Sequence, residues 1–133
     1  MKLTQTPSIK RKSGMTLLEL TVVILVLLSL IAILFVGARA WKKGSDRAAC
    51  ILNIRNVQQA VRGHQNMNNL ALAATLAPAT IYSADGSAYL KTPACPAGGT
   101  YTPGSTVPSY GVLYISCSLS TSDNHVPTGY GDW

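Results

Sequence analysis

The longest feature in the pattern of hydrophobic and polar positions is a continuous apolar block over residues 15–38, which holds a single charged residue, Glu19. A bilayer core about 30 Å thick is crossed by about 20 helical residues, so the block is long enough to span one. Its hydrophobic residues would lie on every side of a helix, which excludes an amphipathic helix on a soluble domain. The block is also too long for one strand. The pattern therefore predicts a membrane helix.

After the block, the hydrophobic positions change to a spacing of 4, 3 and 4 residues, which places them on one face of a helix. The residues on this face are Cys50, Ile54, Val57 and Val61. Trp41, Lys42 and Lys43 stand between the two patterns and suit the far membrane interface, where aromatic and basic anchors collect. We expect one helix from about Met15 to about Asn68, with an amphipathic second half over residues 41–68 that packs against the rest of the chain.

Residues 69–133 are rich in Gly, Pro, Ser, Thr and Tyr, and turn signals interrupt them throughout. The clearest strand is Val112–Ser116, and we expect two to four short antiparallel strands in all. So few residues cannot build an ample core of their own. The predicted fold is therefore α+β: a long N-terminal helix packed on a small β-rich head that depends on the helix face and on a covalent staple.

The positive charge flanks the apolar block. The chain has 11 Lys and Arg against 5 Asp and Glu, a net charge of +6, and only 12% of its residues are charged. Four basic residues precede the block and four follow it closely, as juxtamembrane residues do. They do not form a patch interleaved with aromatic residues, so direct nucleic-acid binding is not predicted.

Three hypotheses account for the block. It is the core of a secretory signal peptide cut near Ala38-Arg39-Ala40, although such cores usually have 7–15 apolar residues. It is a plain membrane anchor, which leaves Glu19 without a reason. Alternatively, a different processing site lies at Ser13-Gly14-Met15, and the apolar helix stays on the mature protein.

The residues around this third site carry a family resemblance. Lys10-Arg11-Lys12-Ser13-Gly14, followed by Met15-Thr16-Leu17-Leu18-Glu19-Leu20, resembles the N-terminal signature of type IV pilins and type II secretion pseudopilins. The resemblance implies a leader over residues 1–14, cleavage between Gly14 and Met15, and N-methylation of Met15. It also implies that residues 15–40 form both the transmembrane helix and the core of a filament.

In that family the fifth mature residue is a glutamate, which is Glu19 here. The resemblance implies that its carboxylate pairs with the Met15 amine of a neighbouring subunit. A subunit in the wrong register would leave both charges unpaired in an apolar bundle. The alternative reading of Glu19 is an incidental charge at a helix start, which the helix dipole favours.

The resemblance also implies the partners and the location. We expect a homopolymer that also contains other pilins or pseudopilins, a prepilin peptidase and methyltransferase, and an inner-membrane assembly platform. The chain would cross the bacterial inner membrane once, with its head in the periplasm, before entering a filament in the periplasm or at the cell surface. A small secreted or anchored domain that never polymerises is the alternative.

The three cysteines are the candidates for the staple. Cys95 and Cys117 flank the short-strand region, and a disulfide between them would add about 3 kcal/mol in the chain-entropy model. It would require an oxidising compartment. Two unpaired buried thiols are the alternative. Cys50 lies on the buried helix face, where it is expected as a small packed hydrophobe, but pairing with either of the other two remains open.

Two later stretches are similar to a group of short pseudopilin-like proteins. Cys95–Tyr101, with Cys117-Ser118 and His125, resembles their C-terminal part. Cys50–Ala60 resembles their helix after the anchor. The stretch between Thr100 and Cys117 is longer than that group leads us to expect.

Enzymatic chemistry is not predicted, because the sequence has no paired carboxylates and no phosphate loop. His64, His125 and the three cysteines do not have the spacing of a metal cluster, so no metal or other cofactor is expected from them. Calcium is a minor alternative, since some pseudopilins bind it in a C-terminal loop. Asp123, Asn124 and Asp132 would be its oxygen ligands, but their spacing fits no known pattern.

Overall fold

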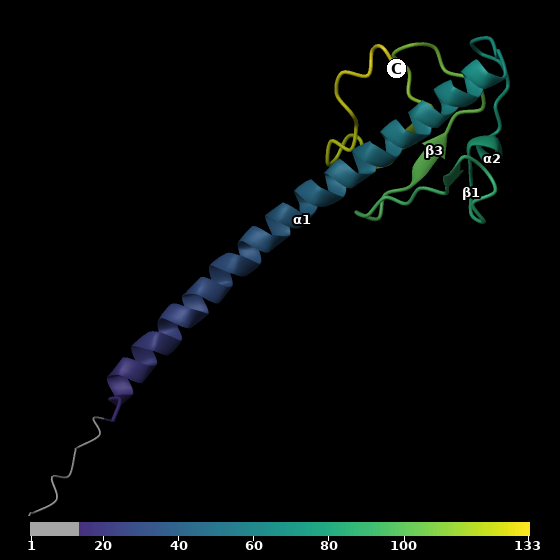
Figure 1. The fold of residues 1–133 in the computed structure, drawn as a ribbon. Helices are drawn as coiled ribbons and strands as arrows, with labels where there is room; N and C mark the ends of the chain where they lie inside the picture. Colours follow the sequence, from purple (N-terminus) through teal and green to yellow (C-terminus); the bar gives the residue numbers. More distant parts are fainter. Residues whose placement is uncertain (1–13) are drawn as a thin grey trace, which may run out of the picture. The chain divides into compact units, whose positions relative to one another are not determined.

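The computed structural model describes residues 14–133. These divide after Ala38 into two compact units, which are described separately. Together they contain one long helix, a second helix of one turn and four short strands (Figure 1). The predicted α+β class, with a long N-terminal helix and a small β-rich head, is confirmed. Of the predicted leader over residues 1–14, residues 1–13 lie outside the described residues.

Helix α1 runs from Leu17 to Met67 and begins with a capping box. The Thr16 backbone N–H donates to a Glu19 carboxylate oxygen at 2.8 Å, and the Glu19 N–H donates to the Thr16 hydroxyl at 3.3 Å. Two backbone donors that the helix itself cannot satisfy are thereby paired. The predicted helix start is confirmed to within two residues.

The helix ends where Asn69 adopts a left-handed conformation, with φ of 48°. The Leu70 N–H then donates to the Gln65 carbonyl at 3.0 Å, which is the six-to-one bond of a Schellman motif. The Asn68 side chain also donates to the His64 carbonyl at 2.9 Å. The last turn is therefore closed by polar residues, and the helix ends one residue before the predicted Asn68.

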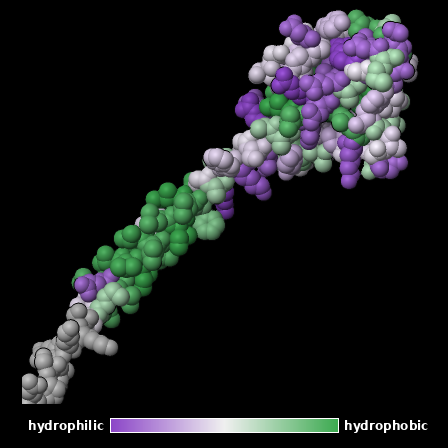
Figure 2. Space-filling model, viewed as in Figure 1, coloured by the Kyte–Doolittle hydropathy of each residue, from purple (hydrophilic) through white to green (hydrophobic). Residues whose placement is uncertain are grey.

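In the first unit, α1 leaves its apolar side chains uncovered. None of the residues in its apolar 18-residue stretch is buried within the described chain. Figure 2 shows its hydrophobic residues as a continuous green surface. By length and composition, the described chain has one helix suited to crossing a membrane once.

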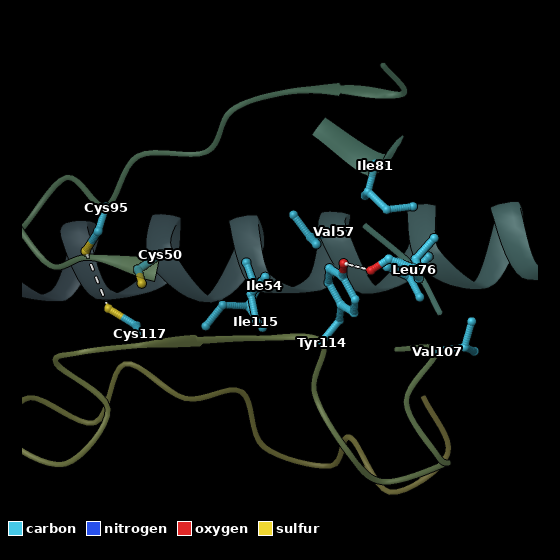
Figure 3. Packing of buried hydrophobic residues seen from close by; sticks show 11 residues of the cluster. Cys50, Ile54, Val57, Leu76, Ile81, Cys95, Val107, Tyr114, Ile115 and Cys117 are labelled. Atoms are coloured by element: carbon cyan, nitrogen blue, oxygen red, sulfur yellow. Dashed lines mark hydrogen bonds between the residues drawn. The ribbon is translucent and has the colours of Figure 1, made fainter. Parts of the chain in front are cut away.

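In the second unit, one face of α1 enters the core of the head. The buried residues of α1 are Cys50, Ile54, Val57, Gln58 and Val61, so the predicted hydrophobic face is confirmed. Residues from the rest of the head cover this face, as Figure 3 shows. They are Leu76, Ile81, Cys95, Val107, Tyr114, Ile115 and Cys117.

The head contains two separate two-stranded sheets. β1 (Tyr82–Ser83) pairs with β2 (Leu90–Lys91), and β3 (Tyr101–Pro103) pairs with β4 (Ile115–Cys117). The short helix α2 (Pro78–Ile81), which the sequence did not predict, leads directly into β1.

Only one of these sheets has the predicted direction. β3 and β4 are antiparallel, with Tyr101 opposite Cys117, whereas β1 and β2 are parallel. A parallel pair cannot form from a tight hairpin turn. The six residues from 84 to 89 instead form a wider loop that brings the chain back in the same direction. The strand predicted at Val112–Ser116 is also displaced, since β4 begins at Ile115.

Candidate functional site

Two regions of the chain hold the residues that the sequence singles out. The first is the segment just before α1. Gly14, Met15 and Thr16 are exposed and lie outside any helix or strand. A Cβ added at Gly14 would meet nothing within 4 Å, so no packing in this chain requires glycine there. The predicted cleavage junction is therefore accessible and free of tertiary contacts within the described residues.

Glu19 lies in the first turn of α1 and faces back toward that junction. One of its carboxylate oxygens accepts hydrogen bonds from both the backbone N–H and the hydroxyl of Thr16, at 2.8 and 3.0 Å. These contacts give Glu19 a structural role that the sequence analysis did not anticipate. The Thr-x-x-Glu spacing of a capping box was the signal that could have revealed it.

The second region is a cluster of sulfur and nitrogen atoms in the head. It is formed by Cys50 on α1, Cys95 in the loop before β3, Cys117 at the end of β4 and His125 in the C-terminal segment. The cysteine Sγ atoms and a ring nitrogen of His125 all lie within 4.8 Å of one another. All four residues are buried, with exposed fractions between 0 and 8%.

The disulfide predicted between Cys95 and Cys117 is not present. Within residues 14–133 the cysteines are free, and these two Sγ atoms lie 3.9 Å apart, against about 2.05 Å in a disulfide. The close-up in Figure 3 shows Cys50 beside this pair. The Sγ atoms of the pair also lie within 4.8 Å of Cys50 Sγ and of a ring nitrogen of His125.

The environment of the sulfurs differs between Cys50 and Cys95. Burial raises the pKa of the Cys50 thiol to about 12, although a hydrogen bond from Tyr101 partly opposes this. Burial also disfavours the thiolate of Cys95, but the backbone N–H groups of Ala97 and Gly99 and the neighbouring thiols outweigh it and lower the pKa of Cys95. Cys95 therefore becomes a thiolate more readily than Cys50 does.

Hydrogen bonds from neighbouring side chains hold the Cys50 sulfur of this cluster in position. The Tyr101 hydroxyl lies 3.1 Å from Cys50 Sγ and donates to it. The Asn53 amide donates to the Tyr101 oxygen at 3.4 Å and to the Ala94 carbonyl at 3.0 Å. Burial and the adjacent Cys50 raise the pKa of Tyr101, so its hydroxyl stays a donor.

Glycine is required beside Cys117. A Cβ added at Gly99 would lie 2.8 Å from Cys117 Sγ and 3.1 Å from the Leu119 side chain. The absence of a side chain at Gly99 thus makes room for the Cys117 sulfur.

The spacing of these residues along the chain did not reveal the cluster. The sequence analysis treated Cys50 as a packed hydrophobe and His125 as one of two unrelated histidines. The structure separates the histidines: His64 Nδ1 lies 3.1 Å from the Tyr89 hydroxyl, while His125 joins the cysteines. Among the described residues, this is the one group of His, Cys, Asp and Glu close enough to share an ion.

The candidate calcium ligands lie elsewhere in the C-terminal segment. Asp123 and Asp132 are exposed, and the Asn124 carbonyl accepts a hydrogen bond from Arg47 at 2.9 Å. Neither aspartate belongs to the group described above. Calcium binding by these residues stays a prediction.

Comparisons with known proteins add no relatives. No family model matches the chain, no curated protein matches it, and no solved structure matches it.

Proposed function

We propose that this protein is a filament subunit of the type IV pilin or type II secretion pseudopilin kind. In this proposal it is inserted once in the inner membrane, cut by a prepilin peptidase between Gly14 and Met15, and polymerised through α1. One observation supports it most. An exposed, non-helical Gly14–Met15 junction directly precedes an uncovered apolar helix whose first turn carries Glu19.

The exposed apolar surface supports polymerisation. Burying a Leu, Ile or Val side chain is worth about 1.5–3 kcal/mol, so a mature chain that keeps the helix needs a bilayer or other copies around it. Cleavage after Gly14 retains the helix, whereas cleavage near Ala38-Arg39-Ala40 would remove it. A bundle of such helices would replace lipid contacts by contacts between subunits.

The capping box supports the role of Glu19. It holds the carboxylate at the first turn, next to the backbone of Thr16 and hence close to the amine that cleavage would create on Met15. A carboxylate so placed can meet the methylated amine of an adjacent subunit. A charge pair inside an apolar bundle is strong only when both partners are present, so it would fix the axial register of assembly.

The mature N-terminus tests the processing step. We expect mass spectrometry of protein from the native membrane to find a chain that begins at methylated Met15. Gly14→Ile should block cleavage without disturbing the fold, because no atom lies within 4 Å of the added Cβ, while Gly44→Ala is a matched control that should be processed normally. A mature chain that begins at Trp41, or an intact Met1, would contradict the proposal.

Two substitutions separate the charge of Glu19 from its capping role. Glu19→Ala removes both, whereas Thr16→Val removes the hydroxyl's hydrogen bonds and keeps the carboxylate. We expect both variants to be processed and inserted, Thr16→Val to assemble into filaments, and Glu19→Ala to fail. If Glu19→Ala still formed filaments under the electron microscope, the proposed register role would be wrong.

A further inference from the structure

We propose that Cys50, Cys95, Cys117 and His125 bind one structural zinc ion in the head. This goes beyond the proposed filament function and does not rest on it. The residue set itself indicates the metal, since three thiolates and one imidazole form a closed tetrahedral site for Zn²⁺. Soft sulfur ligands disfavour calcium and magnesium, which take oxygen.

The distances among Cys95 Sγ, Cys117 Sγ and His125 Nδ1 match such a site, and Cys50 Sγ lies within 4.8 Å of all three. Zinc binds sulfur at about 2.3 Å and histidine nitrogen at about 2.0–2.1 Å, so tetrahedral angles put two sulfurs about 3.8 Å apart and sulfur and nitrogen about 3.6 Å apart. Here Cys95 and Cys117 Sγ are 3.9 Å apart. His125 Nδ1 lies 3.6 Å from the first sulfur and 4.0 Å from the second.

A zinc ion would use all four buried residues, whereas a disulfide would use two. A Cys95–Cys117 bond would remove both thiols that lie near the buried His125 imidazole, and burying a polar group without a hydrogen-bond partner costs free energy. Binding of Zn²⁺ displaces the protons of three thiols and leaves a site with a net charge of −1. His125 also lines a surface pocket with charged side chains. Three of them are basic, Lys42, Lys43 and Arg47, and two are acidic, Asp46 and Asp123.

The surrounding groups are those expected around thiolate ligands. Tyr101 donates a hydrogen bond to Cys50 Sγ at 3.1 Å, and the Asn53 amide donates to the Tyr101 oxygen at 3.4 Å. Such outer contacts orient ligands and stabilise their charge. The four ligands also come from four separate segments of the head, so one ion would join the helix, both ends of the β3–β4 region and the C-terminal segment.

Metal content of the full-length protein tests the proposal directly. The protein is purified in detergent micelles under reducing, oxygen-free conditions, supplied with zinc chloride and dialysed. We expect one zinc ion per chain by elemental analysis. Replacement by Co²⁺ should give the intense visible absorption of tetrahedral cobalt and a thiolate-to-cobalt charge-transfer band. Absence of retained zinc, or a cobalt spectrum of octahedral, oxygen-ligated metal, would refute the site.

Matched variants locate the ion. His125→Ala should lose zinc, whereas His64→Ala, which changes the histidine outside the cluster, should retain it. Tyr101→Phe keeps every ligand and should weaken zinc binding about 10–100-fold, while the exposed Tyr110→Phe should not. If His125→Ala does not fold, the cobalt spectrum of the unaltered chain still decides the matter.

The redox state gives a second, independent result. Protein isolated from the native membrane without reductant should contain zinc and three reduced cysteines. A Cys95–Cys117 disulfide in that material, with no zinc bound, would overturn the proposal in favour of a covalent staple. Neither result depends on whether the chain assembles into filaments.

Discussion

The two halves of α1 both carry large apolar residues, but these residues have opposite surroundings. In the first half Ile33 is 68% exposed, whereas in the second half Ile54 is 1% exposed. Both are isoleucines in the same continuous helix. The difference lies in what covers each half. β4, Leu76 and their neighbours cover one face of the second half, whereas no residue of the apolar 18-residue stretch in the first half is buried within the described chain.

This contrast shows that apolar character alone does not say what a helix packs against. An apolar stripe on one face of a helix is satisfied by a small head. A helix that is apolar all round needs a surrounding medium or a bundle. The first half therefore needs lipid or other subunits to cover its apolar surface. The second half packs against the rest of its own chain.

The largest difference between the two halves is expected when the side chain of the same residue type is shortened in each. Ile54→Ala should lower the free energy of unfolding of the head by about 2–5 kcal/mol, because it leaves a cavity in a close-packed core. Ile33→Ala should change it by less than about 0.5 kcal/mol. Urea denaturation in detergent micelles, followed by near-ultraviolet circular dichroism, measures both. Equal losses in the two variants would show that burial does not set the contribution.

A second comparison concerns polar residues on the second half. Gln58 is buried: its amide donates to the Val112 carbonyl at 3.2 Å and its oxygen accepts from the Tyr114 N–H at 2.9 Å. Gln58→Ala leaves two backbone groups unpaired and should cost about 1–3 kcal/mol. Gln59→Ala, at the exposed neighbouring position, is the control and should be nearly neutral. A neutral Gln58→Ala in the same denaturation assay would mean that water replaces both hydrogen bonds.

The smallest effect is expected at an exposed charge in the loop between β1 and β2. Hydrogen bonds from the Ser83 hydroxyl and from Ser87 lower the pKa of Asp85 to about 2. A carboxyl with a lowered pKa contributes stability above its unfolded pKa of about 4, and this is lost as the pH falls through about 2. Asp85→Asn should therefore be slightly less stable than the unaltered chain at pH 7, and the difference should shrink as the pH falls from about 4 to below about 2.

Thermal unfolding across this pH range measures the difference. The exposed Asp132→Asn is the control for removing a surface carboxylate, since the hydrogen bonds from Ser87 go to Asp85. A constant difference between Asp85→Asn and the unaltered chain at every pH would exclude the carboxylate as its cause.

The periodic features of this protein could be predicted from its sequence. The helix from Leu17 to Met67, its buried face and the α+β class could be predicted from patterns of neighbouring residues. An apolar block of this length and a 4-3-4 spacing of hydrophobic residues are each typical of a helix. The strands were located less well, since strands of two or three residues carry little pattern. The parallel pairing of β1 and β2 depends on how the loop 84–89 turns back.

The sequence by itself determined which residues are apolar and where the helix runs, and it carries the motif on which the proposed processing junction at Gly14–Met15 rests. Which residues lie next to the cysteines was decided by the tertiary structure alone. Cys50, Cys95, Cys117 and His125 come from four distant positions with no regular spacing, and they meet because the helix face and the β3–β4 pair are buried against each other. Helical periodicity is a property of neighbouring residues, whereas a cluster of this kind exists only after distant segments have packed.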